Sequence, residues 1–197
     1  MKRLKIKDVM VTGALSALYF VCVGLGTLLS LVFDRSGSMI YAPACAALLA
    51  GPVYMLLLGK VGKFGAVTLV GAMMAAFFFL SGYMTAAFVP SLLFGLLGDV
   101  VGSLNHYKNK WTNLLSYIVF SFGNLGPIFL MWLMRDAYKA NLLARGKSSE
   151  YVARVMVDFT LETAVWLSAT IILTAIISGL FGHYMIQRYF KQSGLLS

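Results

Sequence analysis

The chain has 197 residues, of which 60% are hydrophobic and only 12% are charged, and its formal net charge is +9. Soluble domains are usually about one-quarter charged, so this composition excludes an ordinary soluble domain and indicates an integral membrane protein. We expect an all-α fold that forms one membrane domain over residues 1–197. The positive charge does not indicate a nucleic-acid partner, because the basic residues flank apolar stretches, where they set orientation and contact anionic membrane lipid.

The first apolar stretch, residues 9–33, contains no charged residue. A bilayer core of ~30 Å needs roughly 20 apolar helical residues, so this stretch is long enough to span it. It is too long for the apolar part of a signal peptide, and we expect it to remain as the first helix. Gly13 and Ala17 give it a face of small residues that lets another helix approach closely. The pattern leaves open whether that helix belongs to another chain or to this one.

Three further spans follow before residue 105. The second is predicted over 39–59, where Pro52 should kink the helix. Residues 64–98 carry no charge, which is too long a stretch for one span, so we divide it at the Ser81-Gly82 pair into spans over about 62–80 and 83–104. Asp99 falls inside the last of these, and we expect a structural role for it.

The fifth span, 111–134, is interrupted by the sequence Gly-Asn-Leu-Gly-Pro at 123–127. Residues 135–158 form the only long connection, which mixes charged and apolar residues and is predicted to be a surface helix or a lid. The sixth span is predicted over 159–187. Six spans put both termini on the same side of the membrane.

The distribution of basic residues orients these spans. If the leader is cytoplasmic, ten Lys and Arg residues lie inside and six outside, and five of the outer six belong to 135–158. Positive charge in short loops favours the cytoplasmic side, so we expect cytoplasmic termini, an outer 135–158 loop and a multi-pass protein of the bacterial plasma membrane. Asp99 would then lie toward the inner end of its span, near Lys60, Lys63 and Lys108 as candidate ionic partners.

The sequence offers little chemistry for catalysis. It contains no phosphate-binding loop and no zinc-binding His-Glu-x-x-His motif, and no paired carboxylates share a helix. Cys22 and Cys45 both sit inside apolar stretches and are expected to be small buried hydrophobic residues rather than a disulfide or a metal pair. We therefore predict no enzymatic activity, no metal site and no cofactor in this chain.

Polar residues inside membrane spans are the candidates for a binding site, because burying them in lipid is costly. Asn124 lies within the helix break, and freed backbone groups at such a break must be satisfied by protein or by a cavity. Glu162, Trp166 and Thr170 share one face of the sixth span. Alternatives to a pocket stay open for both polar residues: Asn124 bonds a neighbouring helix, and Glu162 pairs with Arg135 or Arg154 at the membrane surface. The predicted pocket lies in the outer half between the fifth and sixth spans, lined by Arg35, Tyr83, Asn124, Met131, Glu162, Trp166 and Thr170.

The basic leader, the first-helix sequence Gly-Ala-Leu-Ser-Ala-Leu-Tyr at 13–19 and six spans in under two hundred residues together resemble a known family. The sequence Leu-Leu-Ala-Gly-Pro at 48–52 and the sequence Phe-Gly-Leu-Leu-Gly-Asp at 94–99 also support the resemblance. The chain resembles the substrate-binding S components of energy-coupling factor (ECF) transporters, and within them the family labelled MptD or Trep_Strep.

The resemblance implies a membrane subunit that captures a vitamin-like micronutrient outside, under the loops joining helices 1–2 and 3–4. It also implies a complex with a transmembrane T subunit and two ATPase subunits, which would use the ATP. In the family an Ala-x-x-x-Ala face of helix 1 meets the T subunit, and Gly13 and Ala17 match it here. The long 135–158 loop departs from the compact vitamin binders. A flat anionic ligand such as a haem or another tetrapyrrole is an alternative substrate, and a small assembly or chaperone subunit without a ligand is an alternative function.

Overall fold

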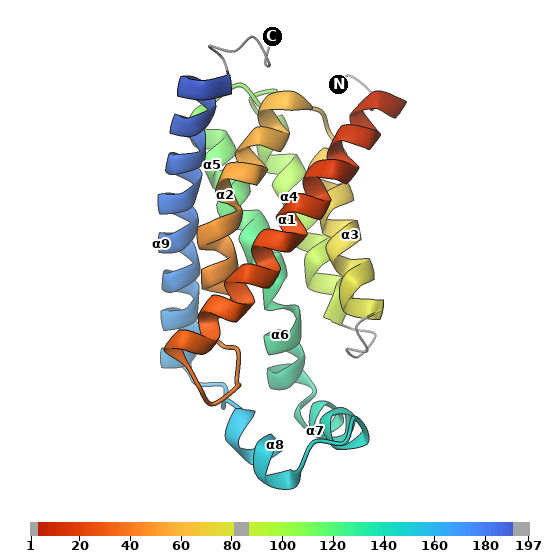
Figure 1. The fold of residues 1–197 in the computed structure, drawn as a ribbon, viewed down its shortest axis with the longest axis vertical. Helices are drawn as coiled ribbons and strands as arrows, with labels where there is room; N and C mark the ends of the chain where they lie inside the picture. Colours follow the sequence, from red (N-terminus) through yellow and green to blue (C-terminus); the bar gives the residue numbers. More distant parts are fainter. Residues whose placement is uncertain (1–3, 81–86, 191–197) are drawn as a thin grey trace.

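The computed structural model describes residues 4–80 and 87–190, and these form helices without any strand. The helices that make the bundle are α1 (Ile6–Phe33), α2 (Ala42–Lys60), α3 (Ala66–Leu80), α4 (Phe88–Ser103), the broken segment α5 (Lys110–Ser121), η2 (Phe122–Leu125) and α6 (Gly126–Leu133), and α9 (Leu161–Met185), which continues as η3 (Ile186–Phe190). The short helices α7 (Arg135–Ala144) and α8 (Ser149–Val155) lie beyond α6 at one end, whereas α1 begins and α9 finishes at the other (Figure 1). The predicted all-α class is confirmed.

Four of these segments are long and apolar enough to cross a bilayer: α1, α2, residues 110–133 and residues 161–188. Helices α3 and α4 have 15 and 16 residues, which at 1.5 Å per residue is about 23 Å, less than a typical hydrocarbon core. Large apolar side chains such as Leu25 on α1 and Phe181 on α9 are exposed, as is typical of a surface that lipid covers. The membrane class is therefore supported, while the count of six crossings stays a prediction.

Helix α2 is the central helix of the bundle. In the most apolar stretch of 18 residues of α2, 67% of the residues are buried. The corresponding shares are 22% for α1 and 28% for α9, which pack on its two sides. Small residues make this packing possible: a Cβ on Gly26 of α1 would lie 2.6 Å from the Cα of Ala46. On the other side the Gly51 amide of α2 donates a 3.1 Å hydrogen bond to Ser178 of α9. Close backbone contact of this kind replaces the hydrophobic drive that lipid removes.

Asp99 of α4 caps the first turn of α3. Its carboxyl group is fully buried and accepts the backbone N–H groups of Gly65 and Thr68 at 2.9 and 2.7 Å and the Thr68 hydroxyl at 2.6 Å. The Tyr107 hydroxyl donates to it at 2.9 Å. Burial raises the pKa of Tyr107 above its ordinary value, so this hydroxyl keeps its proton. These contacts give Asp99 a structural role.

The expected lysine partners of Asp99 were wrong, because backbone N–H groups at the N-terminus of α3 satisfy the carboxyl group instead. Lys63 forms an ion pair with Asp8 of α1 at 2.5 Å.

Two helix boundaries differ from the prediction. The third span was expected from residue 62, but α3 begins at Ala66 because Gly62 and Gly65 have positive φ values of +49° and +98°, which interrupt a right-handed helix. The fourth span was expected from residue 83, and α4 begins at Phe88. The predicted Ser81-Gly82 break and the candidate site residue Tyr83 lie outside the described residues.

Candidate functional site

The break predicted in the fifth span is present as η2, a single 3-10 turn between α5 and α6. Pro127 lies in the first turn of α6, where a residue without an N–H to donate is tolerated. The break is held by α4: Ser91 donates a 2.9 Å hydrogen bond to the Gly123 carbonyl, and a Cβ on Gly126 would lie 2.4 Å from the Ala87 carbonyl oxygen. Because α4 satisfies the break from one side, the Asn124 side chain is left to face the other.

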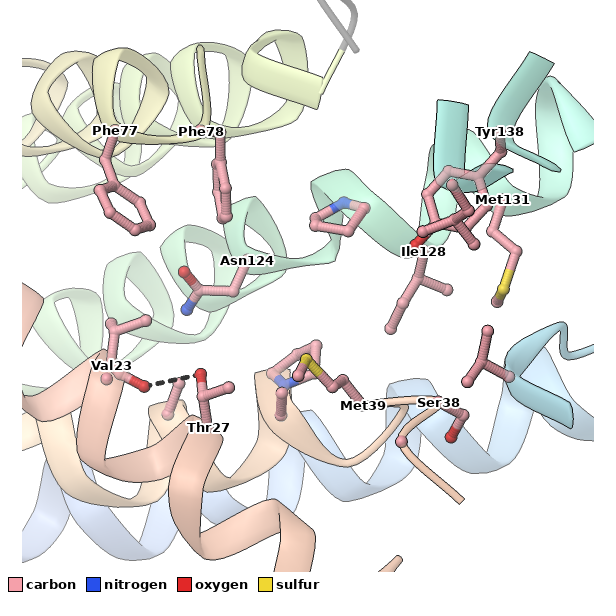
Figure 2. Close-up of a pocket in the computed structure, with 18 of the residues that line it drawn as sticks. Val23, Thr27, Ser38, Met39, Phe77, Phe78, Asn124, Ile128, Met131 and Tyr138 are labelled. Atoms are coloured by element: carbon pink, nitrogen blue, oxygen red, sulfur yellow. Dashed lines mark hydrogen bonds between the residues drawn. The ribbon is translucent and has the colours of Figure 1, made fainter. Parts of the chain in front are cut away.

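A cavity of about 520 Å³ lies on that other side, in the half of the bundle nearest α7 and α8. Figure 2 shows Phe77 and Phe78 of α3 on one side of it, Val23 and Thr27 of α1 on the other, and Asn124 between them. Ile128 and Met131 of α6 continue the wall toward the outer end, where Ser38 and Met39 lie opposite. The volume falls within the roughly 300–1,000 Å³ of small-molecule sites, and the lining is mainly apolar with few polar groups, as such sites are.

Asn124 is the polar group placed deepest among the labelled residues. Within the described part of the chain its hydrogen bond goes to the hydroxyl of Tyr19, with 3.5 Å between nitrogen and oxygen. Hydrogen bonds of this type are usually 2.7–3.2 Å long, so this one is weak. Thr27 uses its hydroxyl within its own helix, donating to the Val23 carbonyl at 2.9 Å. The Asn124 amide therefore has hydrogen-bonding capacity that a ligand could use.

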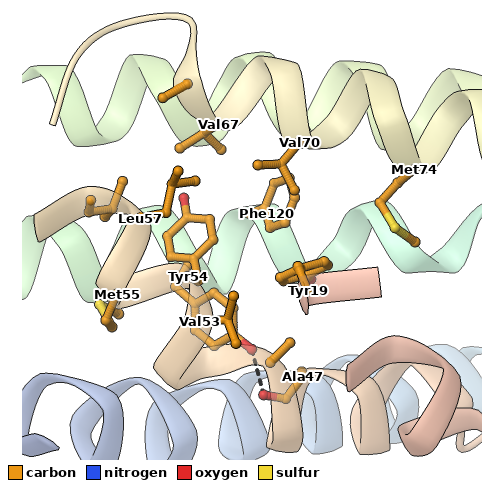
Figure 3. Packing of buried hydrophobic residues seen from close by; sticks show 14 of the residues in the cluster. Tyr19, Ala47, Val53, Tyr54, Met55, Leu57, Val67, Val70, Met74 and Phe120 are labelled. Carbon is orange, nitrogen blue, oxygen red and sulfur yellow. Dashed lines mark hydrogen bonds between the residues drawn. The ribbon is translucent and has the colours of Figure 1, made fainter. Parts of the chain in front are cut away.

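Below Asn124 the bundle is packed with aromatic side chains (Figure 3). Tyr19 meets Phe120 edge to face at 5.4 Å, and Tyr54 and Tyr117 are fully buried. Their hydroxyls are satisfied inside the protein: Tyr54 bonds Ser116 at 2.7 Å, and Tyr117 donates to the Ala47 carbonyl at 2.6 Å, the dashed line in Figure 3. This packing separates the cavity from the end of the bundle that carries Lys60 and Lys63.

Helices α7 and α8 line the outer end of the cavity. Val152 and Val155 of α8 are each 5% exposed although α8 has only seven residues. Gly37, with φ of +83°, lies against Tyr151, whose hydroxyl would be 3.5 Å from a Cβ at that position. An ion pair between Arg135 and Asp158 joins the two ends of the segment. The connection predicted as a surface helix or a lid thus consists of two surface helices that contribute to the cavity wall.

The charged residues that line the cavity are both basic. They are Arg145 and Lys147, on either side of Gly146 in the turn between α7 and α8. Asp34, near the lining residues Gly37 and Ser38, is engaged in its own turn: hydrogen bonds from the hydroxyls of Ser38 and Ser36 lower the pKa of its carboxyl group below the ordinary value. The charged side chains that line the cavity in the described part of the chain thus come from the α7–α8 turn.

The predicted site residues separate into two groups. Asn124 and Met131 line the cavity. Arg35 is exposed in the turn after α1 and does not line it, although its neighbours Gly37 and Ser38 do. Glu162, Trp166 and Thr170 lie on α9 away from it. Trp166 packs edge to face on Tyr41 at 5.1 Å, and Thr170 donates to the Leu167 carbonyl at 2.8 Å.

The cavity does not lie between the fifth and sixth spans, where the pocket was expected. A cluster of apolar side chains fills the space between α6 and α9, formed by Ile40, Ala44, Leu125, Ile128, Met131, Leu167 and Ile171. The cavity instead lies between α1, α3 and α6. A ligand-binding role for the α9 residues stays a prediction that the cavity does not support.

Sequence reasoning did not select the aromatic residues of α1 and α3 or the basic pair of the α7–α8 turn. Phe20, Phe77 and Phe78 line the cavity, but a phenylalanine in an apolar span is equally typical of a lipid-facing or core position. Arg145 and Lys147 could have been noted, because they flank a glycine in a loop already expected to lie outside. Within the described residues no group of three or more His, Cys, Asp or Glu side chains could hold a metal ion.

A family of hypothetical bacterial integral membrane proteins, Trep_Strep, matches residues 6–192. The chain belongs to this family. No curated protein and no solved structure gave a match. The family description places this Trep_Strep protein in a bacterial membrane, in agreement with its apolar helices.

One helix face of this Trep_Strep protein is free of contacts from its own chain. Around Gly13 of α1 no other atom lies within 4 Å of where a Cβ would be, and Ala17 is exposed. The buried side of α1 is formed instead by residues such as Thr12, Ser16 and Tyr19. Among the described residues, no other helix of the chain packs closely at Gly13, so the partner of the small-residue face stays a prediction.

Proposed function

We propose that this protein is the substrate-binding membrane subunit of an ECF-type importer. It captures a small organic molecule on the side of α7 and α8 and delivers it through a partner T subunit powered by two ATPases. The observation that carries the proposal is the cavity of about 520 Å³ around Asn124. An assembly or chaperone subunit without a ligand has no need of a cavity with a polar group at its depth.

Two further features support this function. The cavity is placed at the end of the bundle opposite the start of α1, where a molecule arriving from outside would enter if the termini are cytoplasmic. The exposed face at Gly13 and Ala17 offers a surface on which helices of a T subunit can pack closely. Because the proposed subunit binds and releases its substrate unchanged, it needs no catalytic group or cofactor of its own.

The test is reconstitution. The protein purified alone is analysed by native mass spectrometry for a bound small molecule after exposure to a bacterial metabolite extract. Any compound found is then tested for uptake into proteoliposomes that also contain a T subunit and its ATPases. We expect uptake that requires ATP and this chain together. Absence of a bound compound, with ATPase-module assembly unaffected, would favour the assembly-subunit alternative.

A further inference from the structure

The wall of the cavity near Asn124 is built of apolar and aromatic side chains. They include Phe20 and Val23 of α1, Phe77 of α3 and Ile128 of α6. Asn124 lies between the α1 side and the α3 side of this wall (Figure 2). Phe20 and Phe77 contact each other edge to face, with ring centroids 4.3 Å apart. Such a wall favours a flat ring body, because aromatic rings attract one another when they stack or meet edge to face.

The Asn124 amide has open hydrogen-bonding positions in this apolar wall. A carboxamide donates two hydrogen bonds from its nitrogen and accepts two at its oxygen. In the part of the chain that the structure describes, Nδ2 makes one long bond, to the Tyr19 hydroxyl at 3.5 Å, and no hydrogen bond to Oδ1 is formed. Polar groups without a partner are costly in apolar surroundings. One donor and the acceptor are therefore available to a molecule in the cavity.

The charged residues of the outer end do not select a ligand charge. Arg145 has an interaction within the protein, and the Lys147 ammonium lies 5.1 Å from the centroid of the Tyr151 ring. The two short helices also carry the acids Asp136 and Glu150. The chemistry of the ligand is therefore assigned from the wall around Asn124 alone.

Resting on the proposed transport function, we infer that the ligand is a planar heteroaromatic molecule with a hydrogen-bond donor and acceptor side by side on one edge. Its N–H donates to Oδ1 of Asn124, and the neighbouring carbonyl or ring nitrogen accepts from Nδ2. Both bonds form at once because the donor and acceptor of a carboxamide lie in one plane, as when asparagine binds the edge of adenine. The ring body lies against the phenylalanines of α1 and α3.

A matched pair of fluorescent probes tests this assignment. Lumichrome is a three-ring heterocycle with N–H groups beside its carbonyls, and in 1,3-dimethyllumichrome methyl groups replace both N–H hydrogens. Each is titrated by fluorescence anisotropy against the purified full-length protein in phosphatidylcholine nanodiscs, at slightly acidic pH where both are uncharged. Empty nanodiscs give the background. We expect lumichrome to bind about fivefold more tightly, because a hydrogen bond to the protein exceeds the one given up to water by a modest amount.

Variants separate the hydrogen bonds from the ring contacts. Asn124→Leu should bring the two affinities within twofold of each other, whereas a preference caused by the size of the methyl groups would persist. Phe20→Ala should weaken both probes about two- to tenfold and keep the preference, because it removes a ring contact. Phe181→Ala makes the same change at an exposed position of α9 that does not line the cavity. It should change neither probe.

Three outcomes would overturn the inference. Equal binding of the two probes by the unaltered protein would show that water satisfies the Asn124 amide, and a preference that survives Asn124→Leu would place the donor–acceptor contact elsewhere. Binding of neither probe would exclude the ring assignment. The transport role is judged separately, because it depends on a co-purified compound and its ATP-dependent uptake and stands if these are found.

Discussion

Asn124 combines a position in a helix break with a side chain that makes only a weak hydrogen bond. The surrounding helix must break for Pro127, and α4 satisfies the break, so the amide is free to face the cavity. Its 3.5 Å bond to Tyr19 is weaker than the bonds made by other buried polar groups, such as the 2.6 Å bond of Tyr117. A residue kept polar for structural reasons alone would be expected to make a shorter bond.

Replacing Asn124 with leucine should therefore reduce ligand affinity more than stability. We expect affinity for the co-purified small molecule to fall about two- to tenfold, the value of one hydrogen bond of 0.5–1.5 kcal/mol. Isothermal titration of the purified variant measures this. Trp166→Ala is the comparison, because Trp166 packs on Tyr41 away from the cavity. A loss confined to Trp166→Ala would instead place the ligand beside α9.

Asp99 should behave in the opposite way, affecting stability more than binding. Its buried carboxyl group accepts several hydrogen bonds from α3 and Tyr107, and bonds to charged groups are worth about 1.5–3 kcal/mol each. Asp99→Ala should lower the free energy of unfolding by about 3 kcal/mol or more, read from denaturation in detergent. Thr68→Val, which removes one of the donors to the same carboxyl group, should cost about half as much. Wild-type stability of Asp99→Ala would refute the capping role.

At the scale of the element, helix α1 has two unlike faces. One face is joined to α2 through Gly26, and the other presents Gly13 and Ala17 outward. The sequence predicted this small-residue face but could not decide its partner, because Gly-x-x-x-Ala spacing serves contacts within and between chains equally well. The partner depends on which face of α1 is turned toward the bundle. The close contact between Gly26 and Ala46 of α2 fixes this orientation.

A leucine at Gly13 or Ala17 should impair transport without impairing binding. The added side chain would hold a partner helix away from α1, yet at Gly13 it would meet no atom of this chain. Reconstituted uptake should fall at least tenfold while ligand affinity of the isolated variant stays within twofold. Ala169→Leu makes the same change in size at an exposed position of α9 and should leave uptake unaltered. Parallel loss of folding and binding would show that the face is internal.

The same reasoning explains which parts of the site the sequence could predict. The break at 123–127 followed from a local rule about proline, and the structure has it at the expected place. The partners of Asp99 and the filled space between α6 and α9 depend on side chains far apart in the chain, such as Leu167 against Ile128. No local pattern encodes that packing, so the sequence placed the pocket beside an aromatic-polar face of α9 that does not line this cavity.

At the scale of the molecule, basic residues lie at the two ends of the bundle, as we expect of a chain that crosses the membrane six times. Lys60, Lys63 and Lys108 lie at or between helix ends on the side where α1 begins, and residues 135–158 lie at the opposite end (Figure 1). Because the short connections carry a bias of Arg and Lys, we expect the first of these ends to be cytoplasmic.

Cysteine labelling in intact cells tests this orientation. With Cys22 and Cys45 replaced by serine, Lys147→Cys should react with a membrane-impermeant maleimide before permeabilisation, and Lys108→Cys only afterwards. Both residues are exposed in the structure, so access depends on the side of the membrane alone. The reverse order of labelling would invert the topology and put the cavity on the cytoplasmic side.

The cap that Asp99 provides for α3 also bears on how the protein is made. An aspartate in an inserting apolar helix is costly, up to roughly 2.5–3.5 kcal/mol at the helix centre, so α4 is helped into the lipid by a partner that bonds Asp99. The groups at the start of α3 that donate hydrogen bonds to Asp99 are synthesised some thirty residues earlier. They are therefore already outside the ribosome when Asp99 emerges. We expect the two short helices to leave the translocon together as a hairpin, in which donors at the start of α3 already bond the Asp99 carboxyl group before it meets the bilayer.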